Sequence, residues 1–195
     1  ATITGGSGAD ELTLSAASTV SGNINLGIDG DTTTASNADS LSLDASNVTG
    51  NVTTGSGADA VSVLNTSKIT GNVTLGSNTD SADGADSLTV TGASSSSKSE
   101  ITGSITTGGG ADILTLTNAT IGGAGQTISL GTDTNGLEGN DSLTASGTSI
   151  TANITTGSGS DTLSLSAGSS VTGDVTLGSV GDNQTVLASP FGIHG

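Results

Sequence analysis

The sequence predicts an all-β fold, a parallel β-helix (β-solenoid) of about eight coils in which short and long loops alternate. A short motif recurs along the chain: an aspartate is followed by an apolar or small residue two positions later and again four positions later. It occurs at Asp10, Asp39, Asp59, Asp86, Asp112, Asp141 and Asp161. Within each copy, apolar and polar residues alternate with period two, which is typical of a β-strand with one buried face. Each strand is too short to be stable alone, so the copies are expected to stack on one another.

The composition favours thin regular layers over an irregular globular core. The chain has 195 residues but one aromatic side chain, Phe191, and no Tyr, Trp, Met or Cys. Globular cores usually depend on large aromatic side chains, whereas Val, Ile, Leu and Ala suit stacked β-strands. Low-complexity disorder is the alternative for so polar a chain, but disordered segments lack strict alternation.

Each repeat unit contains three apolar stretches, and each stretch would supply one face of the helix. The first resembles residues 51–55 (Asn-Val-Thr-Thr-Gly), the second follows the repeated aspartate, and the third resembles residues 69–71 (Ile-Thr-Gly). Alternation places one set of apolar side chains in the interior: Val52, Val61, Val63, Ile69, Ile105, Leu114, Leu116 and Ile121. A further inward slot holds Thr54, Thr107 and Thr156 in some coils, and Leu26, Leu75, Leu130 and Leu177 in the others.

Loop length varies in an ordered way along the repeat. The spacings between successive aspartates are 29, 20, 27, 26, 29 and 20 residues. Glycine-rich tight turns precede Asp59, Asp112 and Asp161, whereas residues 27–38, 76–85 and 131–140 form longer loops on the same side. A second corner carries the loop 91–100. We expect one solenoid domain over residues 1–188 and a C-terminal tail over residues 189–195.

The first turn carries a family resemblance. Residues 5–13 (Gly-Gly-Ser-Gly-Ala-Asp-Glu-Leu-Thr) fit the pattern Gly-Gly-x-Gly-x-Asp-x-Leu-x in full, and so resemble the calcium-binding RTX repeats of secreted bacterial proteins. RTX nonapeptides follow one another directly, whereas here one such turn occurs in each coil. Over nearly the whole chain the resemblance is to β-strand-repeat surface proteins, adhesins and surface-layer proteins of bacteria. It implies a secreted, extracellular or cell-surface location.

The resemblance also implies calcium as a cofactor, held between coils by turn carbonyls and by the aspartate carboxylates. The implied metal ligands are Asp10, Asp39, Asp59, Asp86, Asp112, Asp141 and Asp161. Physical reasoning agrees, because carboxylates stacked about 4.8 Å apart repel by about 3–4 kcal/mol at an effective dielectric constant of about 20. The acids of the long loops would add looser sites: Asp29, Asp31, Asp80, Asp83, Asp133 and Glu138.

A second interpretation of the aspartates stays open beside the calcium site. Each carboxylate could accept hydrogen bonds from the amides of its own turn and leave its charge in solvent. The two roles are compatible.

The charge balance excludes several partners. The net charge is −16, and the only cationic side chains are Lys68 and Lys98, which we expect in solvated loops. Nucleic acids and anionic membranes both require cationic contacts, and no apolar run approaches the about 20 residues of a membrane span. We expect no enzyme, since the single histidine, His194, lies in the tail and no catalytic constellation accompanies it.

Both ends of the predicted solenoid lack a cap, and uncapped coils expose unpaired backbone edges. We therefore expect the partner to be the chain itself, as an end-to-end homopolymer, or flanking repeats of a larger chain. The alternative is a monomer whose C-terminal tail folds over one end.

The sequence favours a structural repeat module of a secreted extracellular fibre, surface layer or adhesin, self-assembling end to end and stabilised by calcium. The alternative function is an ice- or carbohydrate-binding face built on Thr/Ser ladders, although Asn25, Gly122 and Ser129 interrupt the ranks.

Overall fold

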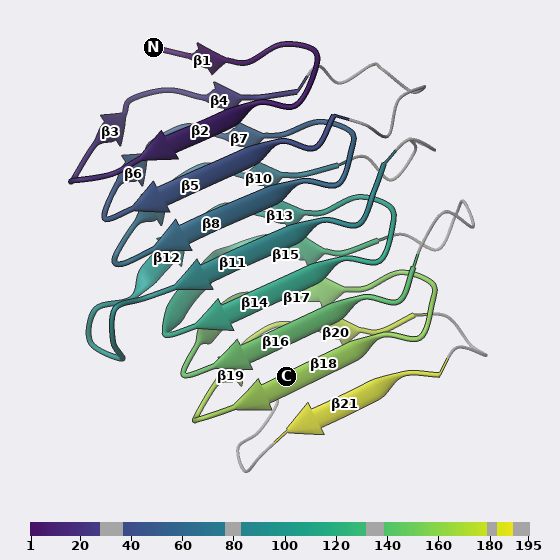
Figure 1. The fold of residues 1–195 in the computed structure, drawn as a ribbon. Coiled ribbons are helices and arrows are strands. Elements are labelled where there is room, and N and C mark those ends of the chain that lie inside the picture. The colour runs from purple at the N-terminus through teal and green to yellow at the C-terminus, as the bar shows by residue number, and fades with distance from the viewer. Residues whose placement is uncertain (28–36, 77–82, 132–138, 179–182, 189–195) are drawn as a thin grey trace.

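The structure is a computed structural model, and it describes residues 1–27, 37–76, 83–131, 139–178 and 183–188. Every helix or strand assigned in these ranges is a β-strand, and the named strands pair in parallel. They stack layer on layer from β1 at one end to β21 at the other (Figure 1). The all-β parallel solenoid predicted from the sequence is therefore confirmed. No helix long and apolar enough to cross a membrane occurs in the described ranges.

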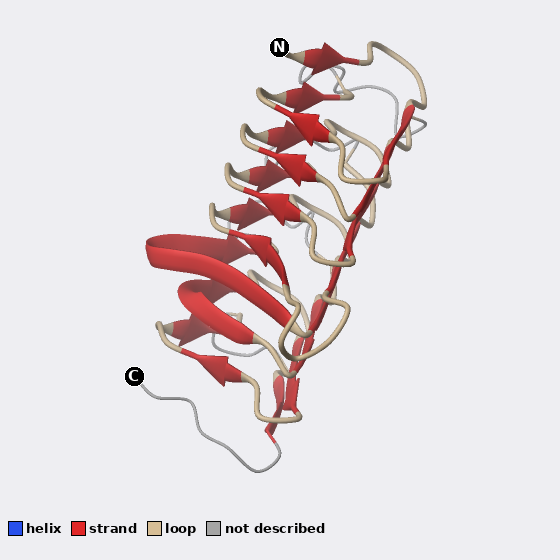
Figure 2. Cartoon of the chain, turned by 90° about the vertical axis from the view of Figure 1, so that its left-hand side faces the viewer, coloured by secondary structure: helices blue, strands red, loops and turns tan. Residues whose placement is uncertain are grey.

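An eight-stranded sheet forms one face and contains the strands that follow the repeated aspartates. In stacking order these are β2 (Glu11–Leu14), β5 (Ser40–Asp44), β8 (Ala60–Leu64), β11 (Ser87–Thr91), β14 (Ile113–Thr117), β16 (Ser142–Ser146), β18 (Thr162–Ser166) and β21 (Thr185–Ala188). Like positions of the repeat pair with like positions; for example, Leu41 pairs with Val61 and Leu43 with Val63. Seen edge-on, this sheet is nearly straight (Figure 2).

The other two apolar stretches of each unit form two columns of a 13-stranded sheet. One column contains β1 (Ile3–Thr4), β4 (Ile24–Asn25), β7 (Val52–Thr53), β10 (Val73–Thr74), β13 (Ile105–Thr106) and β20 (Val175–Thr176). The other contains β3 (Thr19–Val20), β6 (Asn47–Val48), β9 (Lys68–Ile69), β12 (Ser99–Ile101) and β19 (Ser170–Val171).

Two long strands, β15 (Ala119–Ser129) and β17 (Ser149–Thr155), join these columns. They bend around the corner at which the other coils turn (Figure 2). At that corner Gly71 approaches the coil before it so closely that a Cβ would lie 2.4 Å from the Gly50 carbonyl oxygen. In β17 the corresponding residue is Ala152, and the backbone there continues as strand. The sequence predicts three faces, and the structure adds that two of them share one sheet.

The interior follows the predicted alternation. All eight apolar side chains assigned inward from the sequence are at most 1% exposed. The additional inward slot is also confirmed, because Thr54, Thr107 and Thr156 are fully buried. Among the described residues, the core is therefore a narrow stack of aliphatic ranks.

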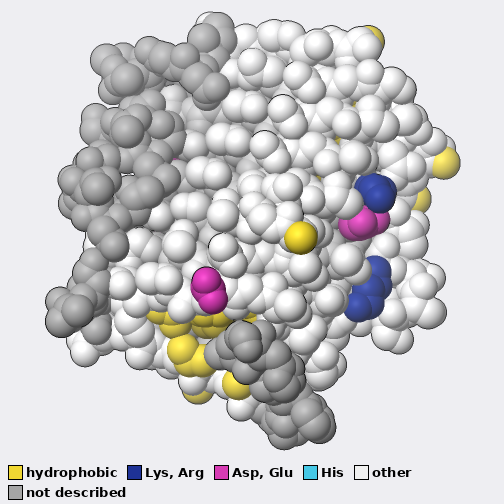
Figure 3. Space-filling view, turned by 180° about the vertical axis from the view of Figure 1, so that it is seen from behind, with side chains coloured by type: hydrophobic (Ala, Val, Ile, Leu, Met, Phe, Trp, Pro, Cys, Tyr) yellow, Lys and Arg dark blue, Asp and Glu magenta, His cyan; other side chains and the backbone are white. Residues whose placement is uncertain are grey.

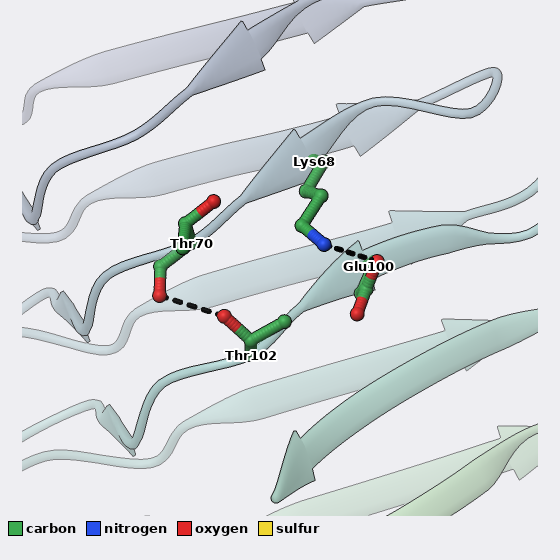
Figure 4. Close-up of polar contacts among 4 residues, drawn as sticks. All are labelled: Lys68, Thr70, Glu100 and Thr102. Carbon is green, nitrogen blue, oxygen red and sulfur yellow. Dashed lines mark hydrogen bonds and ion pairs between the residues drawn. The ribbon is translucent and has the colours of Figure 1, made fainter. Parts of the chain in front are cut away.

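The expectation that both lysines lie in loops is wrong for Lys68, which lies in β9. Its Nζ contacts Glu100 Oε2 in the neighbouring coil at 2.8 Å, and in the same region the Thr102 hydroxyl donates to the Thr70 carbonyl oxygen at 2.7 Å (Figure 4). The Lys68 and Glu100 side chains are 42% and 34% exposed, so the ion pair contributes about 0–1 kcal/mol. Lys98 lies in the loop of the second corner, as expected, where Ser94 and Ser97 form an isolated bridge.

Candidate functional site: a buried aspartate ladder

The seven repeated aspartates lie one above the next, immediately before the strands of the eight-stranded sheet. The in-register pairing of those strands places them there, since Glu11 pairs with Ser40, Ser40 with Ala60, and so on to Thr185. The structure places most of them out of solvent, unlike the interpretation in which each carboxylate leaves its charge in water. Six of the carboxylates are only 0–2% exposed, and Asp10, in the first layer, is half-buried.

Each carboxylate is held by the backbone of the coil before it. The amide of one aspartate donates to Oδ1 of the aspartate in the next coil. The donor-to-acceptor distances are 2.7 Å for Asp10 to Asp39, 2.7 Å for Asp39 to Asp59, 2.7 Å for Asp59 to Asp86, 2.8 Å for Asp86 to Asp112, 2.8 Å for Asp112 to Asp141 and 2.9 Å for Asp141 to Asp161. At the last rung the Asp161 amide donates to Gln184 Oε1 at 3.0 Å. We call this column the aspartate ladder.

Glycines of the tight turns allow the coils to approach closely enough for these bonds. Gly55 and Gly57 have φ of 102° and 127°, and Gly157 and Gly159 have φ of 86° and 130°. Only glycine adopts such angles without strain. A Cβ on Gly57 would also lie 2.5 Å from the carbonyl oxygen of Asn37 in the neighbouring coil.

The second carboxylate oxygen, Oδ2, has two kinds of environment along the ladder. In the tight-turn coils a threonine five residues earlier lies beside it: the hydroxyls of Thr107 and Thr156 donate to Oδ2 of Asp112 and Asp161. In the coils with long loops leucine occupies that slot. Oδ2 of Asp39 and of Asp86 is then buried without a hydrogen-bond partner in the described structure. Oδ2 of Asp59 also lacks one, because the Thr54 hydroxyl donates to the Leu75 carbonyl oxygen at 2.9 Å, although this hydroxyl still lies close enough to lower the pKa of Asp59.

Burial raises the pKa of four of these carboxylates, those of Asp39, Asp59, Asp86 and Asp112. Desolvation raises the pKa of Asp59 and of Asp112 to about 6, and the neighbouring hydroxyls of Thr54 and Thr107 respectively oppose part of that effect. Asp86 lacks such a threonine, and desolvation raises its pKa to about 9, with repulsion from Asp112, Asp83 and Asp59 adding to the effect. Desolvation also raises the pKa of Asp39. Asp86 is therefore a neutral acid at pH 7, whereas Asp59 and Asp112 are mostly ionised.

A neutral Asp86 reduces the repulsion that the sequence poses at this part of the ladder. The ionised carboxylates of Asp59 and Asp112 are then separated by about two coil spacings, or about 9.6 Å, instead of one. Coulomb repulsion falls as the distance grows, so this pair repels about half as strongly as two ionised carboxylates in adjacent coils.

The ladder by itself is a poor fit for calcium. Calcium takes about 6–8 oxygen ligands, but Oδ1 of every ladder aspartate except Asp10 already accepts an amide hydrogen. Among the described residues, no group of three or more Asp, Glu, His or Cys side chains could hold a metal ion. Calcium binding by the seven aspartates stays a prediction from the resemblance.

Of the long-loop acids, only Asp83 lies within the described residues. Its Oδ2 accepts from the Gly109 amide at 2.9 Å, so it bridges two coils beside the ladder. Asp29, Asp31, Asp80, Asp133 and Glu138 lie outside the described residues, as do His194 and the rest of the predicted tail over residues 189–195.

A second surface feature, missed in the sequence analysis, lies on the outside of the eight-stranded sheet. The residue three positions after each ladder aspartate is Ser or Thr in all seven coils, and pairing in register places these hydroxyls in one rank. The rank contains Thr13, Ser42, Ser62, Thr89, Thr115, Thr144 and Ser164. On the other sheet the rank that contains Thr53 and Thr74 is interrupted by Asn25, whereas every member of this rank carries a hydroxyl until it ends at Leu187. We call it the hydroxyl rank.

The two end layers expose part of the core. Ile3, Leu12 and Leu14 in the first layer, and Val175 and Leu177 near the last, pack against the core but are only partly buried. In β21, Val186 and Leu187 are 47% and 58% exposed. Hydrophobic side chains gather at the end of the molecule where the last strands lie (Figure 3).

Comparisons with known proteins add no relative. No family model matches the chain, and no curated protein or solved structure is significantly similar to it. The resemblance to RTX repeats and bacterial surface proteins therefore rests on the motifs quoted above.

Proposed function

We propose that this chain is a structural repeat module of a secreted extracellular fibre, surface layer or adhesin, and that it assembles end to end. The observation that carries the proposal is the open, in-register stack. From β2 to β21 every strand of the eight-stranded sheet pairs in parallel with the next, and both outermost layers leave core side chains partly exposed. Such edges favour pairing with a further strand. That strand would belong to another copy or to a flanking repeat of a larger chain.

The aspartate ladder supports a structural role. Six of its carboxylates are buried, and their Oδ1 atoms accept hydrogen bonds along the solenoid axis. Groups placed in this way hold neighbouring coils together and are shielded from a substrate. The secreted or cell-surface location is proposed from the resemblance to surface proteins.

The test is the length distribution of the purified chain. A single copy should be a rod of about 40 Å, since eight coils rise by about 4.8 Å each. Negative-stain microscopy and light scattering should show multiples of this length at high protein concentration. Longer rods should form more readily at high salt, because screening weakens repulsion between copies that each carry a net charge of −16. Rods of uniform single length at every concentration and salt would contradict the proposal.

Repeating the series in calcium and in EDTA tests the cofactor separately, because loss of the long rods in EDTA would support calcium.

A second candidate function, a binding face for ice or carbohydrate, is favoured by the hydroxyl rank. Seven hydroxyls spaced about 4.8 Å apart on a nearly straight sheet present a periodic surface to a periodic partner. If the rank binds ice, the chain should show thermal hysteresis, and Thr115→Lys in the middle of the rank should abolish it. Thr106→Lys on the other sheet is the matched control and should leave it unchanged. If the rank binds an insoluble polysaccharide instead, the same two variants should separate in a pull-down. Absence of both activities would remove this candidate.

A further inference from the structure

A second ladder of backbone-to-side-chain hydrogen bonds runs opposite to the aspartate ladder. It lies just before the strands of the β4 column, and here the amide of the later coil donates to the side chain of the earlier one. The bonds are Asn51 N to Asn23 Oδ1 at 3.0 Å, Asn72 N to Asn51 Oδ1 at 2.9 Å, Ser104 N to Asn72 Oδ1 at 3.0 Å, Thr127 N to Ser104 Oγ at 3.1 Å and Asp174 N to Asn153 Oδ1 at 3.0 Å. Among the described residues the ladder has one gap, between Thr127 and Asn153. We call it the asparagine ladder.

Because the ladders run in opposite directions, each end of the solenoid has one spare donor and one spare acceptor. At the last layer the Gln184 amide is the next donor of the aspartate ladder, and Asp174 Oδ1 is the next acceptor of the asparagine ladder. At the first layer the Asp10 carboxylate is the corresponding acceptor, and the Thr2 amide is the corresponding donor. None of these four groups forms its ladder bond within the described structure.

We propose that a second copy of this chain docks head to tail so that both ladders continue across the junction. The Gln184 amide of one copy then donates to Asp10 Oδ1 of the next, and the Thr2 amide of that next copy donates to Asp174 Oδ1. The inference rests on the proposed end-to-end assembly and adds its polarity, its register and the groups that form it.

The same register also aligns the partly exposed core residues. Within one copy, Thr162 pairs with Thr185 at the last layer, and Glu11 pairs with Ser40 at the first. If the same register continues across the junction, β21 lies against β2 of the next copy. Thr185 then faces Glu11, and Val186 faces Leu12. In the other column β20 meets β1, and Val175 faces Ile3. Apolar positions thus meet apolar positions, and no acidic side chain of one copy faces an acid of the other at these pairs.

Engineered disulfides test this register, since the chain contains no cysteine. In the double variant with Glu11→Cys and Thr185→Cys, the two exposed positions should lie about 4.8 Å apart across the junction, within the Cα separation that a disulfide tolerates. Within one copy the two positions are at opposite ends of the rod. Mild oxidation should therefore produce a ladder of covalent multimers on a non-reducing gel.

Two controls separate this register from other arrangements. Each single variant should stay monomeric after oxidation, and a mixture of the two should give covalent dimers. The pair Glu11→Cys and Leu187→Cys shifts the register by two residues, to about 8 Å, and should cross-link at least about tenfold less. Cross-linking by a single variant alone would show head-to-head or tail-to-tail contacts. That result, or preferred cross-linking of the shifted pair, would overturn the register while the proposed assembly stands. Absence of association in the unmodified chain would overturn both.

The contribution of the asparagine ladder is measured at Asp174. Asp174→Ala removes the acceptor, whereas Asp174→Asn makes the same change in charge and keeps an acceptor oxygen. Sedimentation velocity should show that association is weakened by about 2- to 10-fold in Asp174→Ala, as for one lost hydrogen bond, and is retained in Asp174→Asn. Equal association of both variants would contradict the continued ladder.

Discussion

At the scale of single residues, the aspartates of the ladder combine two roles that a sequence pattern does not separate. Each backbone amide donates to the next coil, and each side chain accepts from the coil before it. Gln184 shows that the acceptor role needs no charge, because its amide oxygen accepts from Asp161 in the same way. The carboxylic acid at Asp86 differs from an amide mainly in its ability to ionise at high pH.

Replacement of that acid by its neutral isostere, Asp86→Asn, should therefore maintain or raise stability at pH 7. The introduced asparagine keeps an acceptor oxygen for the Asp59 amide, and it cannot acquire the charge that burial disfavours. We expect the melting temperature to match that of the unmodified chain near pH 4, to exceed it at pH 7 and to exceed it further at pH 9. Asp44→Asn, the same change at a partly exposed position of β5, should give no difference between pH 7 and pH 9. A large loss of stability at pH 7 would indicate that Asp86 carries a charge that something neutralises.

The sequence predicts where these residues lie but not what surrounds them. The seven copies share the same short motif, in which apolar residues follow the aspartate at the second and fourth positions. This shared alternation is sufficient to place the seven aspartates in one column. Their burial depends on how closely two coils approach at the glycine turns, which is a property of tertiary packing. One signal was present in the sequence: Thr54, Thr107 and Thr156 each precede a ladder aspartate by five residues, and Leu occupies the slot where the turn is long.

At the scale of elements, period-two alternation predicts the strands after each aspartate well because one residue of slip would reverse every inward side chain. β15 and β17 were not predicted as continuous strands. In those coils the single glycine that turns the corner elsewhere is replaced by Gly-Gly-Ala-Gly at 122–125 and by Ala152. The pairing of β15 with β17 accommodates the extra residues by a register shift between Gly122 and Thr127. Such a bulge depends on the neighbouring strand, so the chain's own pattern does not reveal it.

The hydroxyl rank is also a property of elements, since it exists only once the strands are aligned. In the 13-stranded sheet, Asn25 interrupts the corresponding rank of hydroxyls. In the eight-stranded sheet the pairing from Thr13 to Ser164 leaves no gap. Period-two alternation predicts this rank too, because the residue between two inward positions points outward.

At the scale of the whole molecule, the buried acids make stability depend on pH with an unusual sign. The pKa values of Asp59, Asp112 and Asp86 are about 6, about 6 and about 9 in the folded chain, against about 3.9 for an unfolded aspartate. The folded state therefore binds protons more tightly than the unfolded state. The contribution of these groups to the free energy of unfolding is complete below pH about 4 and is lost as the pH rises through the folded pKa values.

In EDTA, the melting temperature should fall by at least about 5 °C between pH 4.5 and pH 9. The fall should be steeper up to about pH 6, where all three groups contribute, and shallower from there to about pH 9, where Asp86 alone contributes. Calorimetry over this range measures it, and repulsion within a chain of net charge −16 acts in the same direction. A parallel series in calcium tests the predicted cofactor, because a cation bound to the ionised ladder would reverse the slope. A melting temperature in EDTA that rises with pH would show that the carboxylates are not held as buried acids.

The opposed ladders have a consequence for a filament under load. Coils within one copy are joined by the covalent backbone, so such a filament breaks at the junctions between copies. Every broken junction uncovers the same donors and acceptors on its two faces. The fragments of a fibre built in this way could therefore rejoin wherever a junction has opened.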